Sequence, residues 1–95
     1  MKLRFDLSDL QLLRLIEKTG SLSAAAAAVP VALSAASYRL RQLESRLGLA
    51  LFQRRPDGLE PTPAGRIALD HAHRVWQQAE QMQGALEQQS GRQQV

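Results

Sequence analysis

The sequence predicts a mainly α-helical fold with one short β-hairpin. Its 95 residues are 44% hydrophobic but only 4% aromatic, and Ala and Leu supply most of the apolar side chains, which favours helices over sheets. Apolar residues recur at spacings of three and four along several segments, as in amphipathic helices. The Pro-Asp-Gly sequence at residues 56–58 interrupts this pattern and is typical of a turn between strands.

Capping residues delimit the first two predicted helices. Asp6 can cap a first helix, and Gly20 supplies the left-handed residue at which that helix ends. Ser21 can cap a second, short helix rich in alanine, which Pro30 cannot continue. A turn at residues 29–32 therefore separates this helix from the next one.

A third helix is predicted over residues 33–47. Its apolar side chains recur at spacings of four, three and four and form one buried stripe: Ala36, Leu40, Leu43 and Leu47. Its other face is polar and carries Ser34, Ser37, Tyr38, Arg41 and Ser45. The second helix, the turn and the third helix have the layout of a helix-turn-helix.

The rest of the chain adds a hairpin and a long helix. Leu49–Gln53 and Leu59–Pro61 are expected to be the strands, with residues 54–58 as the turn. Thr62 can cap the last helix. The fold class is therefore a winged helix-turn-helix, with three core helices and a hairpin wing, in residues 1–61. A linker or dimerisation helix at residues 62–90 and a frayed tail at residues 91–95 follow it.

The last helix carries an apolar stripe with the 3.5-residue period of a coiled coil. The stripe and its neighbour comprise Ala68, Ala72, Val75, Trp76, Ala79, Met82 and Leu86. Its first two turns are expected to pack on the domain's own core. The remainder predicts a homodimer joined through this helix.

Positive charge is concentrated in the first part of the chain. The net charge is +3, and residues 1–61 hold nine Lys/Arg against six Asp/Glu, whereas residues 62–95 hold three of each. Clustered positive charge attracts polyanions such as duplex DNA. The alternative is an ordinary solvated helix surface.

The polar face of the third helix supplies candidate contacts to duplex DNA. A major groove admits one helix, and its base edges offer donors, acceptors and thymine methyl groups. The candidates for base reading are Leu33, Ser34, Ser37 and Tyr38. Nearby hydroxyl and guanidinium groups, including those of a wing at residues 53–60, are candidates for phosphates or the adjacent minor groove. These are Ser21, Ser23, Arg39, Arg41, Arg54 and Arg55.

Other classes of function have little support in the sequence. Cysteine is absent, and His71 and His73 point about 200° apart on a helix, so we expect no metal site, no cofactor and no enzymatic activity. No apolar run has the roughly 20 residues of a membrane helix, and the expected location is the cytoplasm. The competing hypothesis is a protein-interaction module that uses the helix-turn-helix as a scaffold. Such a module has no need for the clustered arginines.

A set of short motifs covers almost the whole chain in a specific order. It comprises Leu10, Leu13, Gly20, Ser21, Leu22, Ser23, Ala25, Ala26, Ser37, Leu40, Arg41, Leu43, Glu44, Leu47, Gly48, Leu51, Phe52, Arg54, Thr62, Pro63, Ala64 and Gly65. On these residues the chain resembles the N-terminal domain of bacterial LysR-type transcriptional regulators.

This resemblance implies a homodimer joined by the last helix, base-reading positions on the third helix and Arg54 in the wing. The chain departs from the family at the cap before the third helix, Ala32, and at Leu33 and Tyr38, where the family often has glutamine and arginine. The family's effector-binding domain, which would bind a small molecule, is absent. The chain is therefore either a DNA-binding fragment or a naturally short relative, and we expect the fragment.

Overall fold

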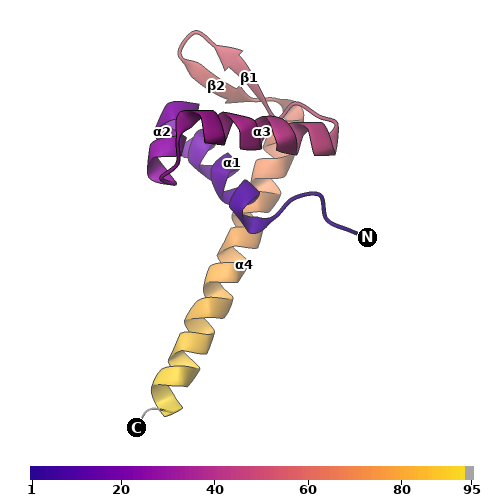
Figure 1. Ribbon diagram of the computed structural model, residues 1–95. Helices are drawn as coiled ribbons and strands as arrows, with labels where there is room; N and C mark the ends of the chain where they lie inside the picture. Colours follow the sequence, from indigo (N-terminus) through magenta and orange to yellow (C-terminus); the bar gives the residue numbers. More distant parts are fainter. Residues whose placement is uncertain (94–95) are drawn as a thin grey trace.

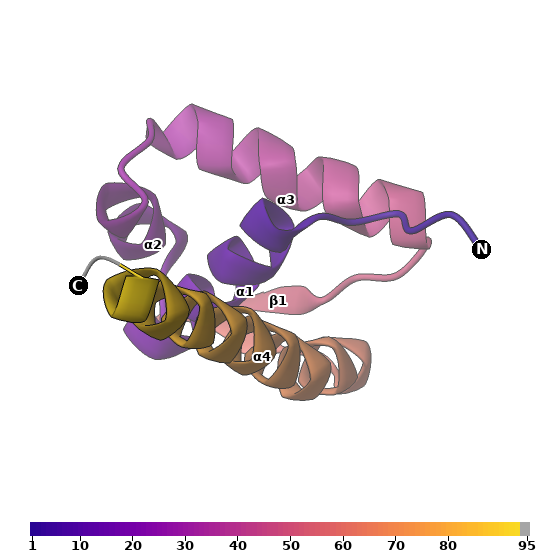
Figure 2. The ribbon, with the colours of Figure 1, turned by 90° about the horizontal axis from the view of Figure 1, so that it is seen from below.

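Three short helices pack together and a fourth, much longer helix leads away from them in the computed structural model, which describes residues 1–93 (Figure 1). The elements are α1 Leu7–Thr19, α2 Leu22–Ala28, α3 Leu33–Leu47, β1 Phe52–Arg55, β2 Gly58–Pro61 and α4 Pro63–Gln93. The mainly α-helical winged helix-turn-helix prediction is confirmed. Seen from below, α1 lies between α3 and α4 (Figure 2).

Side-chain caps fix the beginning of α1. The Asp6 carboxylate accepts the Asp9 backbone N–H at 2.9 Å, and the Asp9 carboxylate accepts the Asp6 N–H at 3.0 Å. This is a reciprocal capping box, in which each carboxylate satisfies an orphan backbone donor. Asp9 is only 4% exposed and also meets Arg46 of α3 at 3.3 Å, so the cap ties two helices together.

Glycines end α1 and α3. Gly20 has a φ of 77° and Gly48 a φ of 73°, the left-handed conformation in which glycine carries no steric penalty. Each donates its backbone N–H to the carbonyl four residues back, at 2.8 Å in both cases. The predicted ends of both helices are confirmed.

The hairpin begins later than the sequence predicted, and its turn is shorter. Its strands pair from Phe52 opposite Pro61 to Arg55 opposite Gly58, so only residues 56–57 form the turn. The prediction of a strand from Leu49 is wrong because the chain before Phe52 bonds to α3 instead. There the Glu44 carboxylate accepts the backbone N–H groups of Leu51 at 2.6 Å and Phe52 at 3.3 Å.

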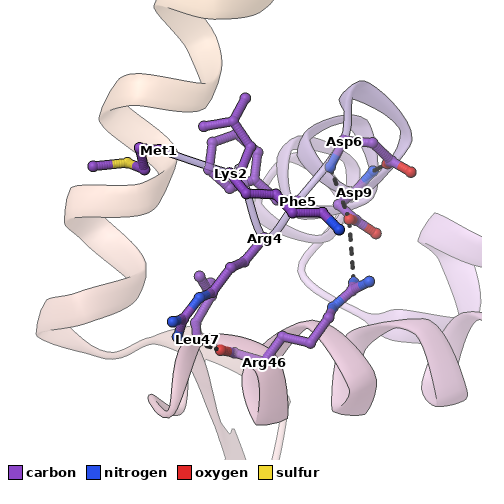
Figure 3. Close-up of a pocket in the computed structure, with 9 residues that line it drawn as sticks. Met1, Lys2, Arg4, Phe5, Asp6, Asp9, Arg46 and Leu47 are labelled. Atoms are coloured by element: carbon purple, nitrogen blue, oxygen red, sulfur yellow. Dashed lines mark hydrogen bonds and ion pairs between the residues drawn. The ribbon is translucent and has the colours of Figure 1, made fainter.

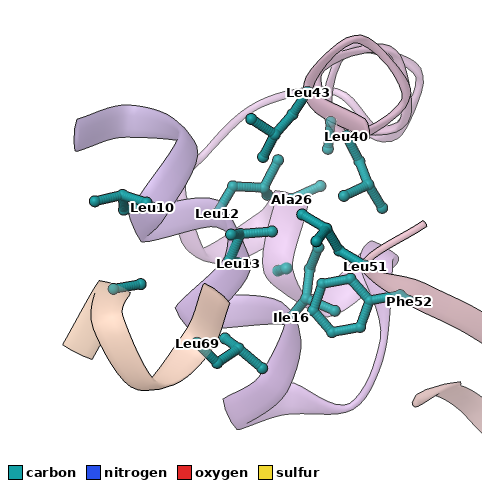
Figure 4. Packing of buried hydrophobic residues seen from close by; sticks show 13 residues of the cluster. Leu10, Leu12, Leu13, Ile16, Ala26, Leu40, Leu43, Leu51, Phe52 and Leu69 are labelled. Atoms are coloured by element: carbon teal, nitrogen blue, oxygen red, sulfur yellow. The ribbon is translucent and has the colours of Figure 1, made fainter. Parts of the chain in front are cut away.

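The core lies between α1 and the surrounding elements (Figure 4). Its largest fully buried side chains are Leu13, Ile16, Leu43 and Leu51. Alanines of α2 and α3 complete it, since Ala25 and Ala36 are 0% exposed and let the helices approach closely. Leu47, predicted on the buried stripe of α3, is only partly buried.

Thr62 caps α4 and joins it to the segment before the hairpin. Its hydroxyl accepts the Gly65 N–H at 3.0 Å and donates to the Ala50 carbonyl at 2.6 Å. Helix α4 then continues through Gln93, so residues 91–93 are helical where a frayed tail was expected. Residues 94–95 lie outside the described residues. Within residues 1–93, no helix combines the length and the apolar character that crossing a membrane requires.

Gly65 marks the closest approach of α4 to the rest of the domain. A Cβ on Gly65 would overlap the Leu51 carbonyl oxygen, whereas a Cβ on Gly84 would meet nothing within 4 Å. We expect Gly65→Ala to lower the free energy of unfolding by about 2 kcal/mol or more because backbone must move. Gly84→Ala, the matched control in the same helix, should raise it by about 0.5–1 kcal/mol through helix propensity. Denaturant unfolding at one protein concentration measures both, and equal effects would contradict this packing.

Candidate nucleic-acid interface

A cleft of about 380 Å³ opens between the start of α2, the start of α3 and the hairpin. Most of the residues predicted to contact DNA are brought together here, although they come from three elements. The predicted residues that line it are Ser21, Ser23, Leu33, Ser37, Arg54 and Arg55. The cleft therefore joins the outer face of α3 to the wing.

The first turns of α3 present a mixed apolar and polar surface. Leu33 is 50% exposed and Tyr38 is 57% exposed, although both are large side chains. Ser34 is exposed beside them, and Ser37 is half-buried at the cleft. Because apolar groups and hydroxyls that can meet base edges are exposed together on the first turns of α3, this surface is a candidate contact surface.

The hairpin is held against the turn between α1 and α2. Leu59 donates its backbone N–H to the Gly20 carbonyl at 3.1 Å. A Cβ on Gly58 would overlap the same carbonyl oxygen, and its φ of 142° also disfavours other residues. The wing therefore has a fixed position relative to Ser21, whose Oγ caps α2 by accepting the Ala24 N–H at 3.0 Å. The Ser21 hydroxyl proton is still available for a ligand.

The two arginines of the wing have different surroundings. Both lie in β1 and are exposed. Arg55 forms an ion pair with Glu60 of β2, with its Nε 2.5 Å from the carboxylate oxygen. The hairpin's two arginines are thus balanced by Asp57 and Glu60. Sequence analysis missed this pair because it placed Arg55 in the turn. A two-residue turn at Pro56 and Asp57 would have put the two side chains on neighbouring strands.

Two arginines of α3 lie apart from the cleft. Arg41 is exposed farther along the helix. Arg39 is half-buried and lines a separate groove with Leu12 and Trp76, so it is not grouped with the other predicted phosphate-binding residues. The sequence analysis proposed both arginines as phosphate contacts, but the structure places Arg39 in this separate groove and leaves Arg41 outside it.

A second basic region surrounds the end of α3 (Figure 3). Arg4 donates from Nη1 to the Arg46 carbonyl at 3.3 Å, and Arg46 in turn meets Asp9. The N-terminal residues line an open cavity of about 1010 Å³ with Arg46 and Leu47. Arg46, counted among the clustered arginines of the sequence, is therefore engaged in joining α3 to α1.

The two histidines of α4 make polar contacts with neighbouring side chains. His73 lies between Arg14 and Glu17, while His71 lies 3.4 Å from Arg74. Over residues 1–93 the structure places no three His, Cys, Asp or Glu side chains close enough to hold a metal ion.

The structure divides the apolar stripe of α4 into two parts. Ala72 is 1% exposed in the domain's own core and Ala68 is partly buried there. Trp76 is half-buried, with the Arg14 guanidinium 5.1 Å from its ring centroid. Ala68 and Ala72 thus pack on the domain's own core, as expected for the first turns of this helix, and Trp76 of the predicted helix–helix interface also packs within the chain. The exposed part comprises Val75, the half-buried Ala79, Met82 and Leu86.

The three packed helices, the docked hairpin and the exposed start of α3 define a winged helix-turn-helix DNA-binding domain. Residues 7–66 match the family model described as "Bacterial regulatory helix-turn-helix protein, lysR family". The chain therefore belongs to the LysR family of bacterial transcriptional regulators.

Relatives and solved structures agree with this assignment. The regulator MetR of Escherichia coli is 40% identical over 76 residues, which cover 80% of this chain and 24% of MetR. Full-length CbnR in complex with its target DNA is 25% identical with a TM-score of 0.78, covering 87% of this chain and 29% of CbnR. The CbnR DNA-binding domain in a DNA complex shares the fold, with a TM-score of 0.80 at 24% identity, covering 90% of this chain and 99% of that domain. The chain thus spans about a quarter of the length of MetR.

The Arg55–Glu60 pair should limit the affinity of the wing for DNA. Glu60→Gln removes a negative charge from the hairpin and frees Arg55, so we expect binding to duplex DNA to tighten about two- to fivefold at low salt. The slope of log affinity against log salt concentration should become steeper by up to about one, the value expected for one additional phosphate contact. Fluorescence anisotropy with a labelled duplex measures both.

Glu80→Gln is the control, because it removes the same charge from an exposed position on α4. It should change affinity much less than Glu60→Gln. Equal gains from both variants would mean that only net charge matters, contrary to a specific role of the pair.

Proposed function

We propose that this chain binds duplex DNA sequence-specifically as the DNA-binding portion of a longer, homodimeric LysR-type regulator. The N-terminal half of α3 would enter the major groove, and the wing would meet the adjacent backbone or minor groove. The observation that carries this proposal is the cleft that joins the outer face of α3 to Arg54. A strand of DNA leaving the groove would pass between these two surfaces.

Base reading is assigned to the first turns of α3. Leu33 suits a thymine methyl group, since both are apolar. The hydroxyls of Ser34 and Ser37 can donate to or accept from base edges, and Tyr38 offers a ring and a phenolic hydroxyl. The large exposed fractions of Leu33 and Tyr38 support this assignment.

Phosphate binding is assigned to residues around this surface. Ser21 and Ser23 line the cleft from the start of α2 and Arg54 lines it from the hairpin, so all three could contact one DNA backbone. Arg41 would reach the backbone farther along α3. Arg39 and Arg55 are the weaker members of the predicted set, because one faces another groove and the other is paired with Glu60.

Self-association is assigned to the exposed part of the α4 stripe. Val75 is 42%, Met82 63% and Leu86 61% exposed, and every residue from 80 to 91 is exposed. A coiled-coil period on a helix face without core contacts favours pairing with a second copy. Two copies related by a two-fold axis would place two recognition helices on inverted half-sites.

The chain covers only 24% of the length of MetR, which supports a proposal about the longer protein. We propose that an effector-binding domain for a small molecule belongs to the longer protein, outside this chain. The chain itself would act in the cytoplasm by binding, with no catalytic step and no cofactor.

Two substitutions test where α3 lies on DNA. Tyr38→Ala should change which sequences are preferred, because a base contact is lost. Arg54→Ala should lower affinity for all sequences by about three- to tenfold and reduce the salt slope by about one. Selection of bound duplexes from a random pool, followed by titration of the selected and scrambled duplexes, measures both effects.

For the unchanged chain, affinity should fall steeply between low and physiological salt, because bound phosphates release counterions. A flat salt response would favour the protein-interaction alternative. The same uniform loss in both variants would show that the placement of α3 is wrong.

The dimer assignment is tested on the exposed stripe. Met82→Glu places a charge in the proposed helix–helix contact and should weaken self-association at least about tenfold. Gln81→Glu adds the same charge one residue away, outside the stripe, and should have little effect. Sedimentation velocity over a range of concentrations distinguishes them, and a chain that is monomeric before substitution would overturn the assignment.

A further inference from the structure

A polar cluster joins α1 to α4, and its residues do not line the cleft between α2, α3 and the hairpin. The Arg14 guanidinium lies 5.1 Å from the centroid of the Trp76 ring, and its Nε donates to His73 Nδ1 at 3.1 Å. The other ring nitrogen of His73 lies 2.7 Å from a carboxylate oxygen of Glu17. Two residues three apart on α1 thus hold two residues three apart on α4, a spacing that places each pair on one helix face.

The geometry of Arg14 is constrained from several directions. Its Nη1 also donates to Gln11 Oε1 at 2.8 Å, so the guanidinium is held by its own helix while it covers Trp76. Because His73 accepts from Arg14 at Nδ1, the neutral ring carries its proton on Nε2 and donates to Glu17. A cation over an indole face is attracted by the ring quadrupole, and partial burial strengthens this attraction.

This cluster is the last attachment of α4 to the domain. Ala72 and Leu69 are buried one and two turns earlier, and Trp76 is half-buried. Beyond it, residues 80–91 are all exposed. The apolar core holds α4 at its beginning, and the polar cluster holds it at the point where it leaves.

The projecting part of α4 is long enough to amplify a small rotation at this point. Residues 77–93 extend about 25 Å at 1.5 Å per residue. A change of about 10° at Trp76 would therefore move the far end by about 4 Å, which is comparable with the rise of one base pair. In a two-fold dimer, the same rotation in both copies would change the separation of the two recognition helices.

We propose that Arg14 is a positioning residue that sets the direction in which α4 leaves the domain, and thereby the spacing of the half-sites that a dimer binds. This inference rests on the proposed function, since it requires DNA binding and pairing through the exposed part of α4. Arg14 itself lies outside the DNA-contact cleft. Its role is to limit the range of α4 directions, so that one spacing of half-sites is favoured over its neighbours.

The experiment compares duplexes that carry two inverted half-sites, taken from selected sequences, with their spacing changed by about one to three base pairs. A duplex with a single half-site is measured in parallel. For the unchanged chain we expect one spacing to be preferred by about tenfold or more. Arg14→Ala should reduce this preference to about threefold or less while leaving single half-site affinity within about twofold.

Lys18→Ala is the matched control, since it removes the same charge from an exposed position one turn along α1. It should keep the spacing preference. Trp76→Leu is the second test variant: it retains an apolar side chain but removes the ring, and it should broaden the preference as Arg14→Ala does. Unchanged single half-site binding shows that each variant is folded.

The outcomes separate this inference from the proposed function. If the unchanged chain and Arg14→Ala prefer the same spacing equally sharply, the positioning role is wrong and the proposed function stands. If the unchanged chain binds no duplex specifically, or binds without any spacing preference, the proposed dimeric function fails and the inference fails with it.

Discussion

The segment from Gly48 to Leu51 is the junction on which the arrangement of this domain depends. On one side, the Glu44 carboxylate at the end of α3 accepts the Leu51 and Phe52 N–H groups. On the other side, the Thr62 N–H donates to the Leu51 carbonyl at 3.0 Å, and Gly65 packs directly against that carbonyl. The Leu51 side chain is buried in the core. One residue thus relates the recognition helix, the hairpin and α4, so a displacement of any one would disturb the other two.

The charge distribution complements this arrangement. Charges on the inner side of α3 are engaged within the domain, since Arg46 meets a buried carboxylate and Glu44 holds the junction. On the hairpin, Glu60 offsets Arg55. The outer face of α3 carries mostly neutral groups near its beginning, with Leu33, Ser34 and Tyr38 exposed. The proposed phosphate contacts and the proposed base-reading contacts therefore lie in different parts of the surface.

Local patterns predicted most of the fold because its helices are delimited by residues with local mechanisms. Asp6, Gly20, Ser21 and Gly48 act within one turn of their own positions, so the sequence places these helix ends. The start of the hairpin could not be predicted in this way. It depends on Glu44, a carboxylate seven residues before Leu51, which competes for backbone groups that a longer strand would use.

The sequence predicted which residues gather at the candidate site, but it did not predict which neighbours the apolar residues of α4 contact. The cleft gathers six of the ten predicted DNA-contact residues, since helical periodicity and the turn signal place them on the same side. The periodicity of α4 could not say which partner each apolar residue meets. Ala72 and Leu86 occupy equivalent positions of one stripe, two heptads apart, yet one is buried in the core and the other is exposed. That difference arises from how far along α4 the domain's own core extends, which is a property of the tertiary structure.

The exposed part of α4 combines weak helix propensity with an exposed apolar face, and both features favour a partner. Residues 77–93 include Gly84, Ser90 and Gly91, which have poorer helix propensity than the Gln, Glu, Ala and Leu around them. A helix of about this length without tertiary contacts is only marginally stable in water. The structure nevertheless continues the helix to Gln93, with Met82 and Leu86 exposed on one face. Burial of that face against a second copy would supply the stabilisation that propensity does not. Since the same helix is held to its own domain by Arg14 and Trp76, the two ends of α4 would have different tasks in the proposed dimer, one setting its direction and the other joining it to its partner.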